Sequence, residues 1–130
     1  MFTLDVQSRL PIYEQLKNNI LRLAALGVLQ PHEQLPSVRS VARQLGINPN
    51  TVQKAYAELE REGVLYSMPG KGSFLSPAAA VESAQYRLAC DEIAASIRSA
   101  IRLGVSAEQI LSLAASICQQ EEEKGENPNA

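Results

Sequence analysis

The sequence predicts a mainly α-helical protein with one small β-hairpin. Three observations favour this fold class: apolar residues recur at helical spacing along most of the chain, a glycine-containing turn separates two short helical stretches, and two short apolar and aromatic runs flank a Pro-Gly-Lys-Gly segment. The 130 residues, 45% of them hydrophobic, suffice for one ordinary core and a short appendage. We therefore expect a compact domain over residues 10–77, a two-helix region over residues 78–123 and a disordered tail over residues 124–130.

A first amphipathic helix is predicted between Pro11 and Gly27. A proline is tolerated in the first turn of a helix, and a glycine after the last turn favours its end. The apolar side chains that recur at helical spacing between them are Ile12, Leu16, Ile20 and Leu23. Pro31 and Pro36 then bracket a connector, because the residue before a proline is disfavoured in a helix.

Two short helices joined by a tight turn follow the connector. Ser37 is a suitable N-cap for the first of them, and Gly46 is a suitable stop. Asn48 can cap the next helix with Pro49 at its first position, and that helix runs to Gly63. The expected buried positions are Val38, Val41, Ala42 and Leu45 in the one helix and Val52, Ala55, Tyr56 and Leu59 in the other.

The next segment predicts a two-stranded hairpin with a basic tip. Residues 64–67 and 73–75 are short runs rich in apolar and aromatic residues, which favour strands. Residues 68–72 between them read Met-Pro-Gly-Lys-Gly, a composition typical of a turn. The order helix, short helix, tight turn, helix and hairpin is that of a winged helix-turn-helix. In such a domain the second helix of the helix-turn-helix lies in the DNA major groove.

The third helix of the chain carries the side chains that we expect to read bases. Since its apolar stripe faces the core, the polar residues of its first turns project away from the domain. These residues are Pro49, Asn50, Thr51, Gln53 and Lys54. Asparagine and glutamine both donate to and accept from base edges, threonine offers a hydroxyl or a methyl contact, and lysine better suits a phosphate. Asn48 and Pro49 serve first as the capped end of the helix.

Basic residues on two neighbouring elements support the same interpretation. Arg39 and Arg43 lie one turn apart on the second helix, opposite its apolar stripe, where they could reach phosphates or a guanine edge. In the hairpin, Gly70 and Gly72 permit close approach of the backbone, and Lys71 adds positive charge at the wing tip. Taken singly these are ordinary surface residues, so it is their order and spacing that indicate DNA binding.

Two C-terminal helices are predicted over residues 78–103 and 106–123, with a break at Gly104. Each has one broad apolar face, and such a pair cannot enclose a drug-sized cavity on its own. A second copy would bury these faces better, which predicts a homodimer; any small-molecule effector would then bind at the dimer interface or between domains. Cys90 and Cys118 lack the spacing of a metal or redox pair, and we expect both to be small buried apolar residues.

The charge distribution permits nucleic-acid binding without demanding it. The chain has a net charge of −2, but this charge is uneven. Residues 1–76 hold eight Lys or Arg against six Asp or Glu, a balance of +2, whereas residues 77–130 hold four against eight, a balance of −4. Phosphate contacts need local rather than global positive charge, so the acidic tail does not oppose a basic DNA-binding head.

An enzyme is not expected. His32 is the single histidine, and neither a paired nucleophile and base nor a metal cluster or cofactor motif can be assembled from the spacing. The segment of residues 70–73 fails the phosphate-loop pattern as well. Because the sequence has no signal-peptide pattern and no run of about 18 apolar residues, we expect a soluble cytoplasmic protein without a membrane partner.

At these residues the chain resembles the GntR family of bacterial regulators. The shared motifs are Leu35-Pro36-Ser37-Val38-Arg39, Ala42 through Leu45-Gly46, Thr51-Val52 with Ala55, Gly63, and a wing ending Gly70-Lys71-Gly72-Ser73-Phe74. Ile12-Tyr13-Glu14-Gln15, residues 48–56 and the short C-terminal region are similar to the small YtrA-type subfamily. The resemblance implies a homodimeric transcription regulator, usually a repressor. It would bind double-stranded operator DNA through Arg39, Arg43, the start of the third helix and the wing tip.

Two positions depart from the family pattern. His32 stands where the family often has glycine after the connector proline, and we expect this to change only a turn. Pro49 stands where the family often has arginine, which shifts base reading to Asn50, Thr51 and Gln53. A different function stays open: a winged helix that docks on another protein, for which the groove-facing side chains would be dispensable.

Overall fold

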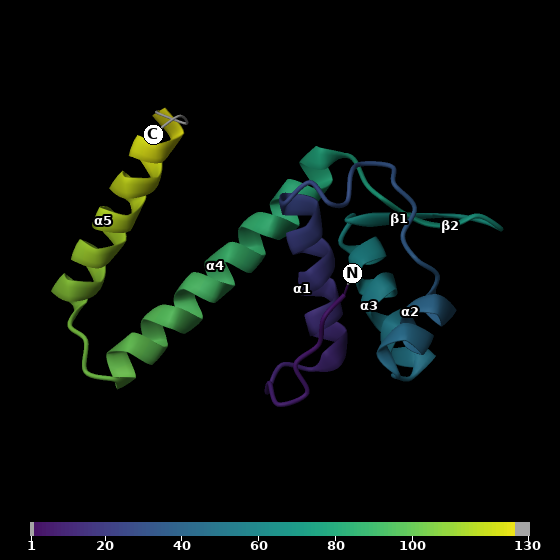
Figure 1. Ribbon diagram of the computed structural model, residues 1–130, viewed down its shortest axis with the longest axis horizontal. Coiled ribbons are helices and arrows are strands. Elements are labelled where there is room, and N and C mark those ends of the chain that lie inside the picture. Colours follow the sequence, from purple (N-terminus) through teal and green to yellow (C-terminus); the bar gives the residue numbers. More distant parts are fainter. Residues whose placement is uncertain (1, 127–130) are drawn as a thin grey trace. The chain divides into compact units, whose positions relative to one another are not determined.

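The structure confirms the predicted fold class. The computed structural model describes the backbone of residues 2–126, within which five helices and one two-stranded antiparallel sheet are formed (Figure 1). In chain order the elements are α1 (Ile12–Ala25), α2 (Val38–Leu45), α3 (Pro49–Arg61), β1 (Leu65–Met68), β2 (Gly72–Leu75), α4 (Ala78–Arg102) and α5 (Ala107–Glu126). The chain divides into two compact units between Leu88 and Ala89, so α4 begins in the first unit and ends in the second.

The first unit is built around α3, which packs against α1, α2 and β1. The side chains with no exposed surface at this centre are Leu16 and Ile20 from α1, Val41 from α2, and Val52, Ala55 and Leu59 from α3. Burial of each large aliphatic side chain contributes about 1.5–3 kcal/mol to folding. The apolar stripes predicted from helical spacing therefore form one common core.

The ends of α2 follow from local chemistry. Ser37 Oγ accepts a hydrogen bond from the backbone N–H of Ser40 at 3.1 Å, which satisfies one of the free donors of the first turn. Gly46 ends the helix with φ +67°, a left-handed conformation that glycine adopts without strain. Both ends of this helix agree with the sequence prediction.

The predicted hairpin is present, and the connector adds an unpredicted pairing to it. β1 and β2 pair from Leu65 opposite Leu75 to Met68 opposite Gly72. The connector between α1 and α2 runs along the free edge of β2. There Gln34 forms an isolated antiparallel bridge with Phe74. Through this bridge the connector, which leads into α2, is attached to the hairpin.

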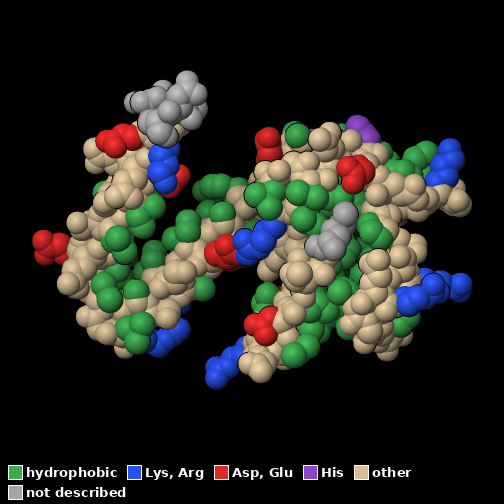
Figure 2. Space-filling view, in the orientation of Figure 1, with side chains coloured by type: hydrophobic (Ala, Val, Ile, Leu, Met, Phe, Trp, Pro, Cys, Tyr) green, Lys and Arg blue, Asp and Glu red, His purple; other side chains and the backbone are tan. Residues whose placement is uncertain are grey.

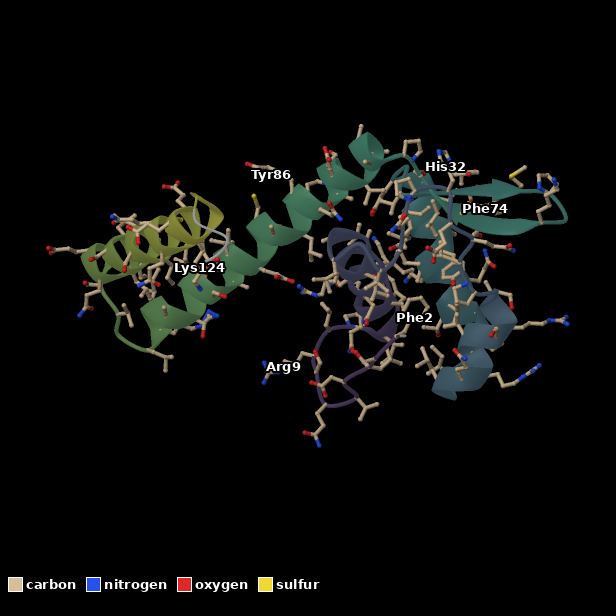
Figure 3. All side chains as sticks on the ribbon, turned by 45° about the horizontal axis from the view of Figure 1, so that its top comes forward. Phe2, Arg9, His32, Phe74, Tyr86 and Lys124 are labelled. Carbon is tan, nitrogen blue, oxygen red and sulfur yellow. The ribbon has the colours of Figure 1, made fainter. Side chains whose placement is uncertain are left out.

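His32 turns the connector toward the wing. Among the described residues it is the one non-glycine residue with a positive φ, +69°. Its backbone N–H donates to Leu75 O at 2.7 Å, and its Nδ1 lies 2.9 Å from Tyr66 Oη. The ring of Tyr66 stacks in turn on Phe74, with centroids 5.5 Å apart. Figure 3 labels His32 and Phe74, which lie near one another beside the hairpin. The departure from the family's glycine therefore preserves the glycine-like turn and adds a side-chain contact.

The first turns of α4 complete the core of the first unit. Val81 and Ala84 are buried in the same cluster as the apolar side chains of α1, α2 and α3. Gln85 Nε2 donates to Leu21 O, at the end of α1, at 3.1 Å. The first compact unit thus extends past residue 77, the predicted end of the DNA-binding domain, as far as Leu88.

The second unit contains the rest of α4 and the whole of α5. Ser106 and Gln109 form a reciprocal capping box: Gln109 N donates to Ser106 Oγ at 3.2 Å, and Ser106 N donates to Gln109 Oε1 at 2.9 Å. α5 continues to Glu126, past residue 124 where we expected a disordered tail to begin; residues 127–130 lie outside the described part of the chain. No helix within residues 2–126 is long and apolar enough to cross a membrane.

The prediction that both cysteines are buried is wrong for the single chain. Cys90 on α4 and Cys118 on α5 are exposed. Two helices provide too little material to cover one another on all sides, so even their large apolar residues stay accessible. Ile97 is 37% exposed and Leu113 is 63% exposed.

The conformation of His32 predicts an unusual order of stability among its variants. We expect His32→Val to lower the free energy of unfolding by about 1–2 kcal/mol more than His32→Gly, because a β-branched residue is strained at positive φ and glycine is not. Urea denaturation of both variants measures the difference. Equal stability of the two would contradict a left-handed conformation at this position.

Candidate nucleic-acid interface

The N-terminal end of α3 is built by the residues that the sequence assigned to it. Asn48 Oδ1 accepts a hydrogen bond from Asn50 N at 2.8 Å, and Pro49 is the first helical residue. The cap fixes the direction in which the helix leaves the turn after α2. The remaining free N–H groups of the first turn, with the positive end of the helix dipole, favour a negatively charged partner at this end.

The burial of α3 separates it into two faces. One face carries the stripe that packs into the core. The side chains of Asn50, Gln53 and Lys54 are exposed on the other, and Thr51 is half-buried between the two. Asn50 and Gln53 can hydrogen-bond to base edges, because they carry both donors and acceptors. The structure thus presents these side chains at the end of the helix that the prediction assigned to the major groove; the contact with DNA itself stays a prediction.

Two contacts with α1 hold α3 in place. Lys17 Nζ lies 3.1 Å from Glu58 Oε2 and 2.7 Å from Glu62 Oε1. Burial lowers the pKa of Lys17, but its hydrogen bonds to Glu62 and Glu58 outweigh burial and raise the pKa overall. Nearer the start of α3, Lys54 Nζ lies 3.8 Å from the ring centroid of Tyr13, a cation–π contact. Tyr13 belongs to the predicted YtrA-like motif, but no sequence pattern indicated this pairing.

A buried hydrogen bond joins α3 to the start of α2. Tyr56 Oη donates to Pro36 O at 2.7 Å, and burial raises the pKa of Tyr56 above its usual value. The phenol is therefore a permanent donor at any physiological pH. This bond fixes the spacing between α3 and the connector directly before α2.

Arg39 and Arg43 extend from α2 into solvent. Both are exposed, and within residues 2–126 neither guanidinium is paired with an acidic side chain. Their charge is therefore free to act on a partner. Figure 2 shows basic side chains along the edge of the first unit where α2 and the hairpin lie.

The wing tip is a tight turn between β1 and β2. Lys71 N donates to Met68 O at 2.9 Å, and the flanking Gly70 and Gly72 have φ values of +74° and +117°. A side chain at either glycine would be strained at such φ values. Lys71 is exposed. The tip thus offers one positive charge on a backbone that can approach a phosphate closely.

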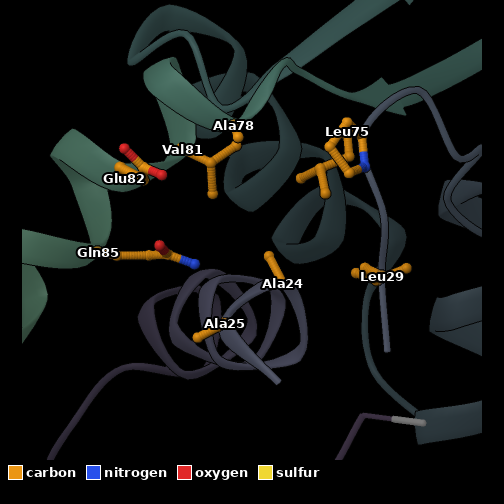
Figure 4. A pocket seen from close by; sticks show the side chains of 9 residues that line it. Ala24, Ala25, Leu29, Leu75, Ala78, Val81, Glu82 and Gln85 are labelled. Atoms are coloured by element: carbon orange, nitrogen blue, oxygen red, sulfur yellow. The ribbon is translucent and has the colours of Figure 1, made fainter. Parts of the chain in front are cut away.

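A small hollow lies away from these basic residues, between the end of α1 and the start of α4. Its volume is about 230 Å³, and Figure 4 shows Ala24 and Ala25 on one side of it and Val81, Glu82 and Gln85 on the other. Pockets for drug-sized ligands begin at roughly 300 Å³. The hollow is too small to enclose such an effector.

Two short helices around a tight turn, an outward-facing polar helix end and a basic wing define the class of protein: a winged helix-turn-helix DNA-binding regulator. The chain matches the family described as "Bacterial regulatory proteins, gntR family" over residues 9–75, and it belongs to that family. The family consists of transcription regulators rather than enzymes, in agreement with the sequence prediction.

The predicted YtrA-like character is also confirmed. The chain is 45% identical to the HTH-type transcriptional repressor YtrA of Bacillus subtilis over 76 residues, which cover 58% of either protein. A GntR family transcriptional regulator from Listeria monocytogenes superimposes with a TM-score of 0.72 at 30% identity, covering 87% of this chain and 98% of that one. The DNA-binding domain of AraR, in complex with operator ORX1, gives a TM-score of 0.52 at 30% identity and covers 58% of this chain and 93% of that one.

Substitution of the cap residue separates helix stability from DNA binding. Asn48→Ala should lower the free energy of unfolding by about 1 kcal/mol, because it removes the cap. Asn48→Asp keeps the cap and should leave stability unchanged, but its carboxylate should weaken DNA binding at this end of α3. Denaturant unfolding and fluorescence anisotropy with labelled DNA measure the two effects. If Asn48→Asp bound DNA as tightly as the wild type, the start of α3 would not lie against the negatively charged duplex.

Proposed function

We propose that the protein is a transcriptional repressor that binds a palindromic operator as a homodimer. One observation carries the proposal: the polar end of α3, the two arginines of α2 and the wing lysine are all exposed on one compact unit. The operator complex of the AraR domain supports a DNA partner for this fold. DNA as the partner also favours a cytoplasmic protein.

The roles of the residues divide between bases and backbone. Asn50, Thr51 and Gln53 read base edges in the major groove, with Asn48 and Pro49 forming the helix end beside them. Lys54 contacts a phosphate. The other backbone contacts come from Arg39, Arg43 and the Gly70-Lys71-Gly72 tip.

A homodimer is supported by the second unit. Large apolar side chains remain exposed on both of its helices; they are Ile93, Ile97, Ile101, Leu111, Leu113 and Ile117. Two copies would bury these side chains in a four-helix centre and present two DNA-binding units. The matching operator has two half-sites about 34 Å apart, one turn of DNA. An effector, if the protein has one, binds at the dimer interface or between domains.

Removal of single charges tests the DNA interface. Arg39→Ala and Lys71→Ala should each weaken binding to a duplex selected from random sequence or from DNA upstream of the protein's own gene. Each should also reduce the slope of the logarithm of the binding constant against the logarithm of the salt concentration by about one. Arg61→Ala is the matched control, since it removes an exposed charge at the opposite end of α3. Failure of the wild-type protein to prefer any sequence would overturn the proposal.

Charges placed in the apolar faces test the dimer. Ile97→Asp and Leu113→Asp should raise the dimer dissociation constant by at least about 30-fold, because an unpaired buried carboxylate costs several kcal/mol. Ser99→Asp, on the same helix as Ile97, is the control. Analytical ultracentrifugation measures the assembly, and operator affinity should fall with it.

Removal of the second unit by truncation also tests whether this unit forms the dimer. A chain ending at Leu88 keeps the buried Val81 and Ala84 and should remain folded but monomeric. If it were still dimeric, the second unit would not be the dimerisation region.

A further inference from the structure

One side chain of the connector reaches the tip of the wing. Gln34 Nε2 donates a hydrogen bond to the backbone oxygen of Lys71 at 2.6 Å, across 37 positions of sequence. This carbonyl belongs to the residue between the two glycines of the tip. Within the turn, Lys71 N donates to Met68 O. Gln34 adds a hydrogen bond to this residue from outside the hairpin.

The fit between Gln34 and the tip is close. A Cβ added at Gly72 would lie 2.9 Å from Gln34 Nε2, well inside normal contact. The φ of +117° at Gly72 excludes most side chains as well. The glycine therefore leaves the space in which the amide reaches the Lys71 carbonyl.

The same short segment is fixed to the recognition helix. Leu35 N donates to Ser73 O at 2.9 Å, and Pro36 O accepts the hydrogen bond from Tyr56 Oη at 2.7 Å. Residues 34–36 thus contact the wing on one side and α3 on the other. They bridge the two elements that the proposed function places on the same duplex.

We infer that Gln34 is a positioning residue for DNA binding, which holds the wing tip, and with it Lys71, at a fixed place relative to α3. The inference rests on the proposed function. Two glycines give the tip wide conformational freedom, and binding to DNA must remove that freedom. A tip that is already ordered in the free protein loses less conformational entropy when it binds. Gln34 therefore strengthens DNA binding without touching DNA.

The first test compares Gln34→Met with the wild type in the full chain. Methionine keeps the length of the side chain but cannot donate to Lys71 O. Affinity for the selected duplex should fall by about three- to ten-fold, the effect of one net hydrogen bond. Gln30→Met, the same substitution in the same connector, is the control and should bind like the wild type. Unchanged affinity of Gln34→Met would overturn the inference.

A double-mutant cycle shows whether Gln34 acts through Lys71. Lys71→Ala removes the charged side chain but keeps the carbonyl that Gln34 binds. In the Lys71→Ala background, Gln34→Met should change affinity by less than about two-fold, since no charge remains to be positioned. An undiminished effect in that background would mean that Gln34 contacts DNA itself or only stabilises the fold, and either result would overturn the inference.

A measurement without DNA separates this inference from the proposed function. Backbone ¹⁵N relaxation should show lower order parameters at Lys71 and Gly72 in Gln34→Met than in the wild type, with α3 unchanged. Equal order parameters would overturn the inference even if the protein bound DNA normally. Absence of sequence-specific binding by the wild type, with the tip ordered by Gln34, would instead overturn the proposed function.

Discussion

The two faces of α3 impose the constraint on which the rest of the first unit depends. One face must be buried completely, and Val52, Ala55 and Leu59 achieve this by packing among α1, α2 and β1. Under the proposed function the other face must stay uncovered, because any element packed there would exclude a duplex. The core therefore lies on one side of the helix. Its position is fixed by contacts with α1 and with the segment before α2: the Lys17 ion pairs and the Tyr56 hydrogen bond.

Local features are predictable from the sequence because their physics is local. A cap acts over three residues and an apolar stripe over one helix, so the roles of Ser37, Gly46 and Asn48 follow correctly from the sequence alone. The partners of Lys54 and Gln34 are not predictable in this way. Both contacts join segments far apart in the chain, and neither a tyrosine in α1 nor a glutamine in the connector is distinctive by itself.

The boundary after the wing also depends on contacts between distant segments, which the local sequence does not predict. Pro77 and the alanines that follow are local signals of a break, and they mark the start of α4 correctly. Whether the helix then joins the preceding core depends on the surface that it meets. Val81 and Ala84 find an apolar surface near the end of α1, so the first compact unit closes only at Leu88.

The exposed cysteines have a practical consequence. Both thiols of the chain lie on the second unit, at Cys90 and Cys118, and the first unit has none. A maleimide dye or spin label would therefore mark the second unit while leaving the proposed DNA-binding surface chemically unmodified. Because thiols covered by a partner react more slowly, the labelling rate of the native protein would report its assembly without any substitution.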